Sequence, residues 1–382
     1  MGRGRRRFRA LAVGVPLAAL ALAALLAAAE WAARQRVFHV TRARPSGLAE
    51  RLEASPALLI ETSDRGRRYR AGADVRVHHH PLARGEVRIE VGPHGFRHPP
   101  LGPRAPGERR ILVLGDSVTA ADYLRREEIY TARLQALLAG LSGLEPGPVQ
   151  VVNAGVGNVG IREEIALLED RGLAIEPDVV LLAFYLNDAQ PSWGAVFGGP
   201  AQPGIERYSV LLQALEQLRA LRRLRDSPLV AWRAQAETLD WRASPEALRA
   251  LAESAAADWG AAWHPGAWGA VDEGLARLRA LAQAHGFRAA VLAFPVVYQV
   301  EAAFLERGPQ AALAERAARL GLPFLDLLPV LRRDAGPAAF LDQCHLDARG
   351  HAVVAQALQE FLRREGLLGV AAAPAPPAPP GS

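Results

Sequence analysis

The chain contains no lysine, one cysteine and one methionine, and only 6% of its residues are aromatic. A single cysteine, Cys344, excludes an intrachain disulfide framework and any zinc site built from several thiolates. All 45 basic residues are arginines, and five of them fall within the first nine positions. Without those five, 40 basic residues face 40 acidic ones, so the body of the chain is close to neutral. We therefore expect no nucleic-acid partner, because a basic groove for phosphates is not indicated.

Hydrophobic residues, in contrast, make up 50% of the 382 positions. That share provides for a large buried core and excludes a wholly disordered chain. The length corresponds to two or three domains. The end of the chain departs from this composition, because residues 367–382 are rich in proline and alanine. We expect a disordered tail there.

Residues 1–35 have the pattern of a signal anchor. An uncharged run from Ala10 to Ala29, rich in alanine and leucine, directly follows the arginine cluster, and about 20 apolar residues suffice to cross a bilayer as a helix. Positive charge ahead of the run assigns the N-terminus to the cytoplasm and the body to the extracytoplasmic side of the cell membrane. The alternative is a signal peptide cleaved at the small residues Ala27 to Ala29, which would give a secreted protein.

Residues 36–105 form a mixed segment, which we interpret as an extension that packs on the domain after it. Its clearest element is the alternating stretch 86–91, which is typical of a strand. Three consecutive histidines, His78, His79 and His80, raise the possibility of a metal. Three neighbours in a strand cannot all face one ion, and no carboxylate cluster lies beside them. We interpret them as a solvated loop, and we predict neither a metal nor a cofactor.

Between residues 106 and 366, short apolar runs alternate with helical patterns. The apolar runs occupy 111–114, 149–152, 178–184, 289–294 and, more weakly, 323–326. The helical patterns occupy about 127–141, 162–171, 271–285, 310–320 and 348–365. This alternation predicts an α/β fold with a parallel five-stranded sheet that is covered on both faces. In such a sheet the active site lies beyond the carboxyl ends of the strands.

A helical insertion at about 190–268 separates the third apolar run from the fourth. It contains most of the seven tryptophans, among them Trp193, Trp232, Trp241, Trp259 and Trp263. We favour a helical subdomain with an aromatic core over a substrate platform. A lid or an acyl pocket stays open as an alternative, because the insertion leaves from the expected active-site end of the sheet.

Three residues near the strand ends offer nucleophilic chemistry. Ser117 lies in the turn directly after the first apolar run, where its hydroxyl is accessible, but a serine is a poor nucleophile without a neighbouring base. Asp342 and His345 stand three positions apart in a turn before the last helix, so the carboxylate is able to orient the imidazole. Asp347 competes for the acid role but is better interpreted as the N-cap of that helix. His351 falls inside it.

Two further segments offer hydrogen-bond donors for an oxyanion. Residues 153–158 form a glycine-rich turn after the second run, and Asn187 places a side-chain amide just beyond the third. Asn187 is also a common kind of turn residue. Asp116 is expected to hold the turn of Ser117 rather than to take part in the chemistry, and Asp188 is expected to support Asn187.

Taken together and in chain order, these motifs resemble the blocks of the SGNH (GDSL-type) hydrolase family, over about residues 109–365 apart from the insertion. Gly115-Asp116-Ser117 resembles the first block, which carries the nucleophile. Residues 153–158 resemble the second, Asn187-Asp188 the third, and Asp342 to His345 the last, which carries the acid and the base. Gly95-Phe96-Arg97 resembles a segment ahead of the first block in membrane-anchored members.

The resemblance implies a flavodoxin-like three-layer α/β/α sandwich, no metal, and hydrolysis or transfer of ester-linked acyl groups through Ser117, His345 and Asp342. The oxyanion donors would then be the N–H of Ser117, the amide of Asn187, and the turn at Gly157 and Asn158. Asn158 stands where the usual second block has a glycine, so which of Gly155, Gly157 and Asn158 donates to the oxyanion stays open.

The resemblance does not identify the substrate. Because we expect the body to be exported, we predict an acyl ester on a cell-envelope glycan or lipid. The alternative from another class is a non-catalytic glycan-binding or scaffold protein that keeps the same fold. Against it stands the retention of Ser117, Asp342 and His345, which an inert member would be expected to lose. The sequence does not fix the oligomeric state.

Overall fold

Near-continuous apolar runs form the central sheet. Its strands are β6 (Arg109–Gly115), β7 (Val149–Gly155), β8 (Val179–Tyr185), β9 (Arg288–Phe294) and β10 (Phe324–Asp326). In this computed structural model, which describes residues 2–140, 147–190, 204–225, 227 and 230–368, every residue of β8 is buried. All pairings are parallel, in the order β10-β9-β8-β6-β7, which is the flavodoxin-like order. The predicted parallel five-stranded sheet is confirmed.

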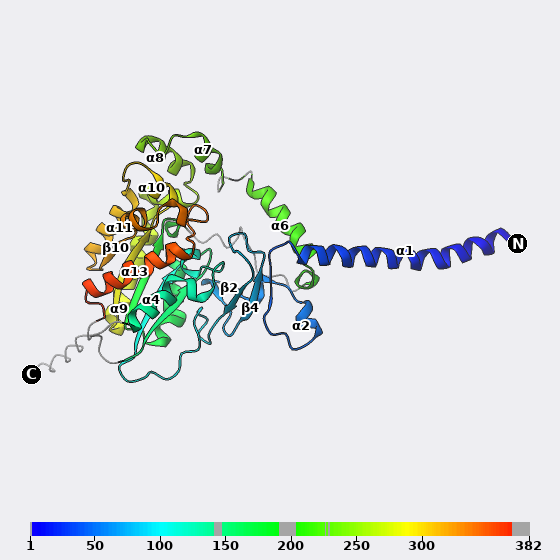
Figure 1. Cartoon of the computed structure of the whole chain (residues 1–382), viewed down its shortest axis with the longest axis horizontal. Coiled ribbons are helices and arrows are strands. Elements are labelled where there is room, and N and C mark those ends of the chain that lie inside the picture. The colour runs from blue at the N-terminus through cyan, green and yellow to red at the C-terminus, as the bar shows by residue number, and fades with distance from the viewer. Residues whose placement is uncertain (1, 141–146, 191–203, 226, 228–229, 369–382) are drawn as a thin grey trace, which may run out of the picture.

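Helices cover both faces of this sheet, which completes the three layers (Figure 1). They are α4 (Tyr130–Ala139), α5 (Ile161–Leu167), α9 (Gly269–His285), α11 (Gly308–Arg319) and α13 (Ala348–Arg364), with the short α3 (Ser117–Ala120), α10 (Val297–Glu301) and α12 (Leu328–Asp334) between them. The predicted helices are present, with ends shifted by a few residues. The helix expected at 162–171 is shorter, because α5 continues into a π-helical turn at Leu168–Gly172.

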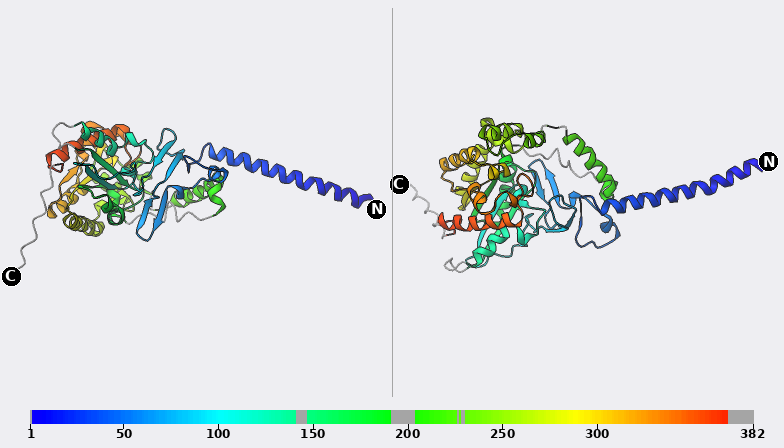
Figure 2. Two further views of the ribbon diagram at one scale, coloured as in Figure 1. Left: turned by 90° about the horizontal axis from the view of Figure 1, so that it is seen from below. Right: turned by 45° about the horizontal axis from the view of Figure 1, so that its top comes forward.

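The insertion divides into two parts. Its helices are α6 (Val210–Arg225), α7 (Trp232–Thr238) and α8 (Pro245–Ser254), followed by two 3-10 turns at Trp259–Trp263 and Pro265–Trp268. Trp232, Trp259 and Trp263 pack edge to face, and Tyr298 joins them together with Trp241. This is the predicted aromatic core, although Trp193 lies outside the described residues. Helix α6 is separate from it and lies beside the inner end of α1 (Figures 1 and 2).

Helix α1 (Gly2–Arg34) projects away from the rest of the molecule (Figures 1 and 2). Its segment Val15–Arg34 is long and apolar enough to cross a membrane, and none of that segment's apolar window is buried. It includes most of the run predicted to be an anchor. The structure therefore has one exposed apolar helix near the N-terminus, as a signal anchor or a signal peptide requires.

The extension after α1 is built from small antiparallel sheets. β1 (His39–Arg42), β4 (Asp74–His78) and β5 (Val87–Glu90) form one sheet, β2 (Ile60–Ser63) and β3 (Gly66–Tyr69) form a hairpin, and α2 (Leu48–Leu52) is a single short helix. The strand predicted at 86–91 is β5. The tail predicted to be disordered falls almost entirely on residues 369–382, which lie outside the described residues.

One buried arginine fixes the extension to the sheet. Arg97 donates from its backbone N–H to the carbonyl of Asn153 at 3.0 Å. Its guanidinium donates to the carbonyls of Ala120, Ala121 and Leu124 at 2.6–2.7 Å. Because these carbonyls follow α3, Arg97 holds the segment directly behind Ser117.

Candidate active site

The turn between β6 and α3 presents Ser117 at the carboxyl edge of the sheet. Asp116 caps α3, and its carboxylate accepts the N–H of Val118 at 2.9 Å. Gly115 is needed at the end of β6, since a Cβ there would lie 2.3 Å from the Thr119 hydroxyl. These two residues fix a tight strand-to-helix turn with Ser117 as the first residue of the helix.

The turn from Asp342 to His345 brings an imidazole to this hydroxyl. The carboxylate of Asp342 accepts the backbone N–H groups of Cys344 at 2.9 Å and His345 at 2.8 Å, which folds the turn back on itself. His345 Nδ1 lies 2.8 Å from Asp342 Oδ2, and His345 Nε2 lies 3.0 Å from Ser117 Oγ. The structure thus brings Ser117 together with two side chains that lie 225 or more positions further along the chain.

The electrostatics of this group favour a charged pair. Burial pushes the pKa of Asp342 up, but the hydrogen bond and charge of His345, with the two backbone donors, outweigh it and bring the pKa down to about 2. Burial acts to lower the pKa of His345, and the hydrogen bond and charge of Asp342 outweigh it, so the net shift is upward. An imidazolium that forms when His345 takes a proton is therefore stabilised.

The glycine-rich turn after β7 borders the Ser117 side chain. The N–H of Gly155 already donates to Asn153 Oδ1 at 2.9 Å. Gly155 is also tightly packed, because a Cβ there would lie 2.4 Å from the backbone nitrogen of Ala120. Gly157 lies next to Ser117, because a Cβ on Gly157 would be 3.8 Å from the Ser117 Cβ. Asn158 adopts a left-handed backbone with φ +60°, which asparagine tolerates better than most residues.

Asn187 and Asp188 follow β8 in a short 3-10 turn, Leu186–Ala189. The Asn187 side-chain oxygen is buried and has no hydrogen-bond partner among the described residues. Asp188 is fully buried and accepts the N–H of Tyr185 at 2.7 Å. Burial, together with the nearby Glu164, raises the pKa of Asp188 well above its usual range. In the described part of the chain neither Asn158 nor Asn187 forms a hydrogen bond with Ser117.

Other titratable groups near the site have structural partners. Asp347 caps α13, as predicted, by accepting the N–H groups of Arg349 and Gly350 at 2.9 Å each. Cys344 is buried, and burial raises the pKa of its thiol well above the usual range. Asp342, Cys344 and His345 are the one cluster of potential metal ligands within the described ranges. Their carboxylate and imidazole atoms already bond to one another and to Ser117.

Three residues beside the site carry no local sequence signal. The Tyr123 ring lies edge-on to the His345 ring, with centroids 5.4 Å apart, and its hydroxyl donates to the Leu346 carbonyl at 2.9 Å. Asp258 comes from the insertion, and burial raises its pKa to about 7. Glu164 of α5 is a buried carboxyl whose pKa burial raises well above its usual range. Only the tertiary fold brings them close to His345 or Asp188.

Of the three histidines of the extension, which we expected in a solvated loop, His79 is exposed and follows β4 in a loop, whereas His78 and His80 are half-buried. His78 ends β4 and lies 2.9 Å from the Thr41 hydroxyl and 3.1 Å from Glu86. His79 Nε2 lies 3.2 Å from the carbonyl of Arg34, and the half-buried His80 faces the Tyr123 ring at 5.9 Å. The prediction was wrong for His78, because β4 pairs with β1 through residue 78 and places this imidazole beside Thr41.

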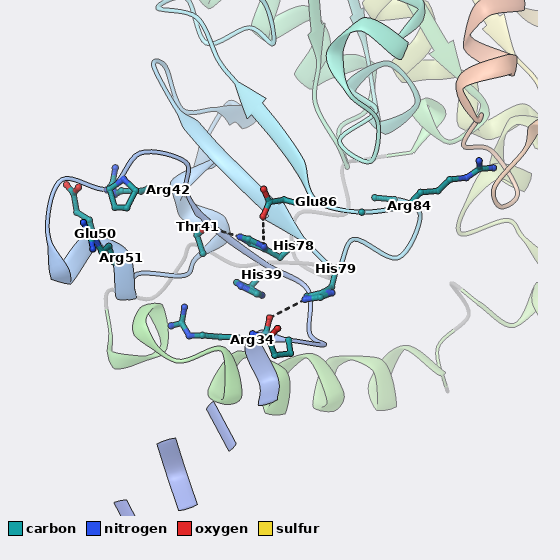
Figure 3. Close-up of a pocket in the computed structure, with 14 residues that line it drawn as sticks. Arg34, His39, Thr41, Arg42, Glu50, Arg51, His78, His79, Arg84 and Glu86 are labelled. Carbon is teal, nitrogen blue, oxygen red and sulfur yellow. Dashed lines mark hydrogen bonds and ion pairs between the residues drawn. The ribbon is translucent and has the colours of Figure 1, made fainter. Parts of the chain in front are cut away.

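A cavity of about 760 Å³ lies among these histidines, beside the inner end of α1 (Figure 3). Its lining includes Arg34, His39, Thr41, His78 and His79. Neither Ser117 nor its two partners lines it. The cavity is therefore separate from the candidate active site.

A hydroxyl, an imidazole and a carboxylate in hydrogen-bonded order at the edge of a parallel sheet form the arrangement of serine hydrolases. No protein-family model matches the sequence, and no curated protein matches it. Among solved structures, an alpha/beta hydrolase from the metagenome of Lake Arreo in Spain is similar at 18% identity, covering 69% of this chain and 97% of its own, with a TM-score of 0.38.

Two further solved structures are similar at the same level. A protein described as a lipolytic member of the G-D-S-L family, from Desulfitobacterium hafniense, shares 11% identity over 66% of this chain and 99% of its own, with a TM-score of 0.34. An acetylxylan esterase from Geobacillus stearothermophilus shares 18% identity over 69% of this chain and 94% of its own, with a TM-score of 0.37.

Proposed function

We propose that this protein is a serine esterase of the SGNH (GDSL) type that hydrolyses or transfers ester-linked acyl groups. The observation that carries the proposal is the unbroken chain of contacts from Ser117 Oγ to His345 Nε2 at 3.0 Å and from His345 Nδ1 to Asp342 Oδ2 at 2.8 Å. Geometry of this kind lets a neutral imidazole take the proton of an otherwise unreactive hydroxyl.

The reaction begins with proton transfer from Ser117 Oγ to His345 Nε2, while the oxygen attacks the carbonyl carbon of the ester. The carbonyl electron pair moves onto the oxygen, and the negative charge of Asp342 stabilises the imidazolium. When the tetrahedral intermediate collapses, the bond to the alcohol breaks and His345 gives its proton to the leaving oxygen. Water or a second hydroxyl, deprotonated by His345, then attacks the acyl-serine and releases the acid or the new ester.

We assign the oxyanion to donors at three neighbouring strand ends: the N–H of Ser117, the side-chain amide of Asn187, and the turn at Gly157 and Asn158. The proximity of Gly157 to Ser117 supports the last of these. Gly155 is not among the donors, since its N–H is already bonded to Asn153. Asp116 and Asp188 support the turns that carry Ser117 and Asn187.

The exposed apolar helix α1 supports a place for this esterase at the membrane, with its body outside the cytoplasm. In this proposal α1 stays attached as a single-pass anchor and residues 106–366 form the hydrolase domain. The substrate is an acyl ester on an envelope glycan or lipid. Competition between water and an added sugar hydroxyl, followed as free acid against acyl-sugar, separates hydrolysis from transfer.

Replacing the nucleophile tests the proposal. We expect Ser117→Ala, in the full chain in detergent, to lower turnover of a short-chain aryl ester roughly a thousandfold or more and to abolish labelling by a fluorophosphonate. The matched control is Ser46→Ala, because Ser46 is exposed and hydrogen-bonds only within its own turn. Undiminished turnover in Ser117→Ala, or a wild-type chain that does not react with the probe, would favour a binding or scaffold role instead.

A further inference from the structure

The inner end of α1 is bonded directly to the folded body. The Glu30 carboxylate accepts the N–H groups of Val210 and Leu211 at 2.9 and 3.0 Å and the Ser209 hydroxyl at 2.8 Å, so it caps the start of α6. One turn later, Arg34 donates to the carbonyls of Leu52 and Tyr208 at 2.8 and 3.1 Å. Among the described residues, these bonds join the end of α1 to the extension and to the start of α6.

These bonds set the height of the body relative to a bilayer. Glu30 and Arg34 both belong to the segment Val15–Arg34, whose 20 residues match the thickness of a hydrocarbon core. Ala33, in the same turn, packs with Ala54 and Val210 in a small buried cluster. Therefore α2 and the start of α6 lie at the level where α1 leaves the apolar layer.

Large apolar side chains are exposed at that level. We call them the collar, and they are Trp31 (67% exposed), Leu48 (74%), Leu52 (49%), Leu212 (36%) and Leu215 (45%). Further along α6, Arg219 and Arg222 are exposed as well. Tryptophan beside leucine and arginine is the composition that favours the interface between headgroups and acyl chains. A bilayer surface is thus the occupant that fits the collar, because the collar continues directly from α1.

A short path leads from the same turn of α1 to the base of the proposed triad. The carbonyl of Arg34 meets His79 Nε2 at 3.2 Å, as the dashed line in Figure 3 shows. The next residue, His80, faces the Tyr123 ring at 5.9 Å, and that ring contacts the His345 ring at 5.4 Å. Helix α13, which begins three residues after His345, starts on the side of the domain that faces the extension and runs away from it (Figures 1 and 2).

We propose that the active site opens beside the membrane surface that α1 leaves, and that its substrate is an acyl ester carried by a membrane lipid. This inference rests on the esterase and the anchor proposed above. The bonds of Glu30 and Arg34 prevent the body from turning away, and the collar keeps it against the lipid. An ester held in the same bilayer then meets Ser117 at a high effective concentration. Ser117 attacks its carbonyl, the ester C–O bond breaks and the lipid hydroxyl leaves with the proton held by His345. Water then attacks the acyl-serine, so that a carboxylic acid is released and Ser117 regains its proton.

Two probes with one reacting ester separate membrane placement from chemistry. One is the acetyl ester of a hydroxycoumarin in solution, and the other is the same ester on the short headgroup of a dialkyl lipid. The full chain is reconstituted in vesicles of phosphatidylcholine and phosphatidylglycerol. A polar helical spacer of about 14 residues between Ala28 and Ala29 lifts the body by about 21 Å while Glu30 and Arg34 keep their contacts. The same spacer between Arg9 and Ala10 is the control.

We expect the lifting spacer to lower turnover of the lipid probe about tenfold or more and to leave the soluble probe unchanged, and the control spacer to change neither. Equal turnover of the lipid probe by the lifted and the unaltered chains would overturn the inference, as would a chain that cleaves only the soluble probe. Both results leave the proposed esterase standing. A chain that cleaves neither probe contradicts the esterase itself, and the inference falls with it.

A second pair of variants tests the collar without moving the body. Leu48→Gln together with Leu52→Gln removes exposed apolar surface, so the fold is not at risk. We expect turnover of the lipid probe to fall about threefold while turnover of the soluble probe stays constant. Leu305→Gln, which changes a leucine that is 53% exposed on the hydrolase domain, is the matched control and is expected to change neither. An unchanged lipid probe in the double variant contradicts contact between collar and bilayer.

Discussion

Two histidines six positions apart, His345 half-buried and His351 fully buried, differ in the direction of their pKa shifts. His345, in the turn at the sheet edge, has a carboxylate on one ring nitrogen and a hydroxyl on the other, and its pKa is raised. His351, inside α13, accepts the N–H of Tyr130 at 3.2 Å, and burial lowers its pKa to about 3. Burial acts to lower the pKa of both rings, yet the pKa of His345 is raised, so burial alone does not determine the charge of an imidazole. The carboxylate of Asp342 makes the difference.

The largest expected effect comes from removing that carboxylate. Asp342→Asn makes His345 resemble His351, because an amide can neither stabilise the imidazolium nor hold the same tautomer. We expect kcat/KM for a soluble aryl ester to fall by roughly a thousandfold to ten-thousandfold. The measurement needs a circular dichroism spectrum beside it, since Asp342 also holds the backbone of its turn. A folded variant with kcat/KM within tenfold of the wild type contradicts the assigned role of Asp342.

A second expected effect concerns stability rather than rate. The unfolded chain protonates His351 below about pH 6.5, whereas the folded chain does so only near pH 3. Protonation in this window therefore favours unfolding, and His351 costs about 1.4 kcal/mol of stability per pH unit as the pH falls through it. His351→Gln keeps an acceptor for the Tyr130 N–H without a titrating group. We expect its free energy of unfolding to fall less steeply between pH 6.5 and 4.

Denaturant unfolding of the full chain in detergent at several pH values measures this slope. The control is His285→Gln, because His285 is exposed at the end of α9. It is expected to leave the slope of the wild type unchanged. Equal slopes in His351→Gln and the wild type mean that His351 is protonated in the folded protein.

The smallest expected effect tests which charges around His345 raise its pKa. Asp258 and Asp116 add to Asp342 in raising the pKa of His345, and Asp258 is the third of these in size. A proton-accepting His345 must be neutral, so activity rises with pH through its raised pKa. Asp258→Asn removes the negative charge that Asp258 carries above its own pKa of about 7. We expect the acid limb of the kcat/KM profile to shift to lower pH over the range in which that charge is present. The exposed Asp240→Asn should not move it, and a limb that shifts upward contradicts this origin of the raised pKa.

Much of the sheet and of the candidate site could be predicted from the sequence, because both depend on local patterns. Apolar runs mark the strands, and parallel strands end at one edge, so Ser117, Asn187 and the turn at Gly157 had to lie near one another. The spacing of Asp342 and His345 predicts a carboxylate beside an imidazole. The approach of this turn to Ser117 was predicted from the family resemblance. In the structure, His345 Nε2 lies 3.0 Å from Ser117 Oγ.

Contacts between distant segments were not predictable in the same way. The leucines and arginines of α6 have the pattern of any amphipathic helix, so nothing local assigns α6 to α1 instead of to the aromatic core. Glu30 looks like the polar end of an apolar run, and its role as a cap exists only after α6 has docked. His78 was misinterpreted for the same reason, since a strand pairing over 37 positions places it against Thr41.

The bonds of Glu30 also bear on processing of the chain. A peptidase that recognises Ala27, Ala28 and Ala29 has to bind the residues around the cleaved bond in an extended form. In the folded protein those residues are helical, and the next one is fixed to the start of α6 by three hydrogen bonds. In the anchored protein proposed above, a peptidase would have to break these bonds and unwind the end of α1 before it reached the bond after Ala29.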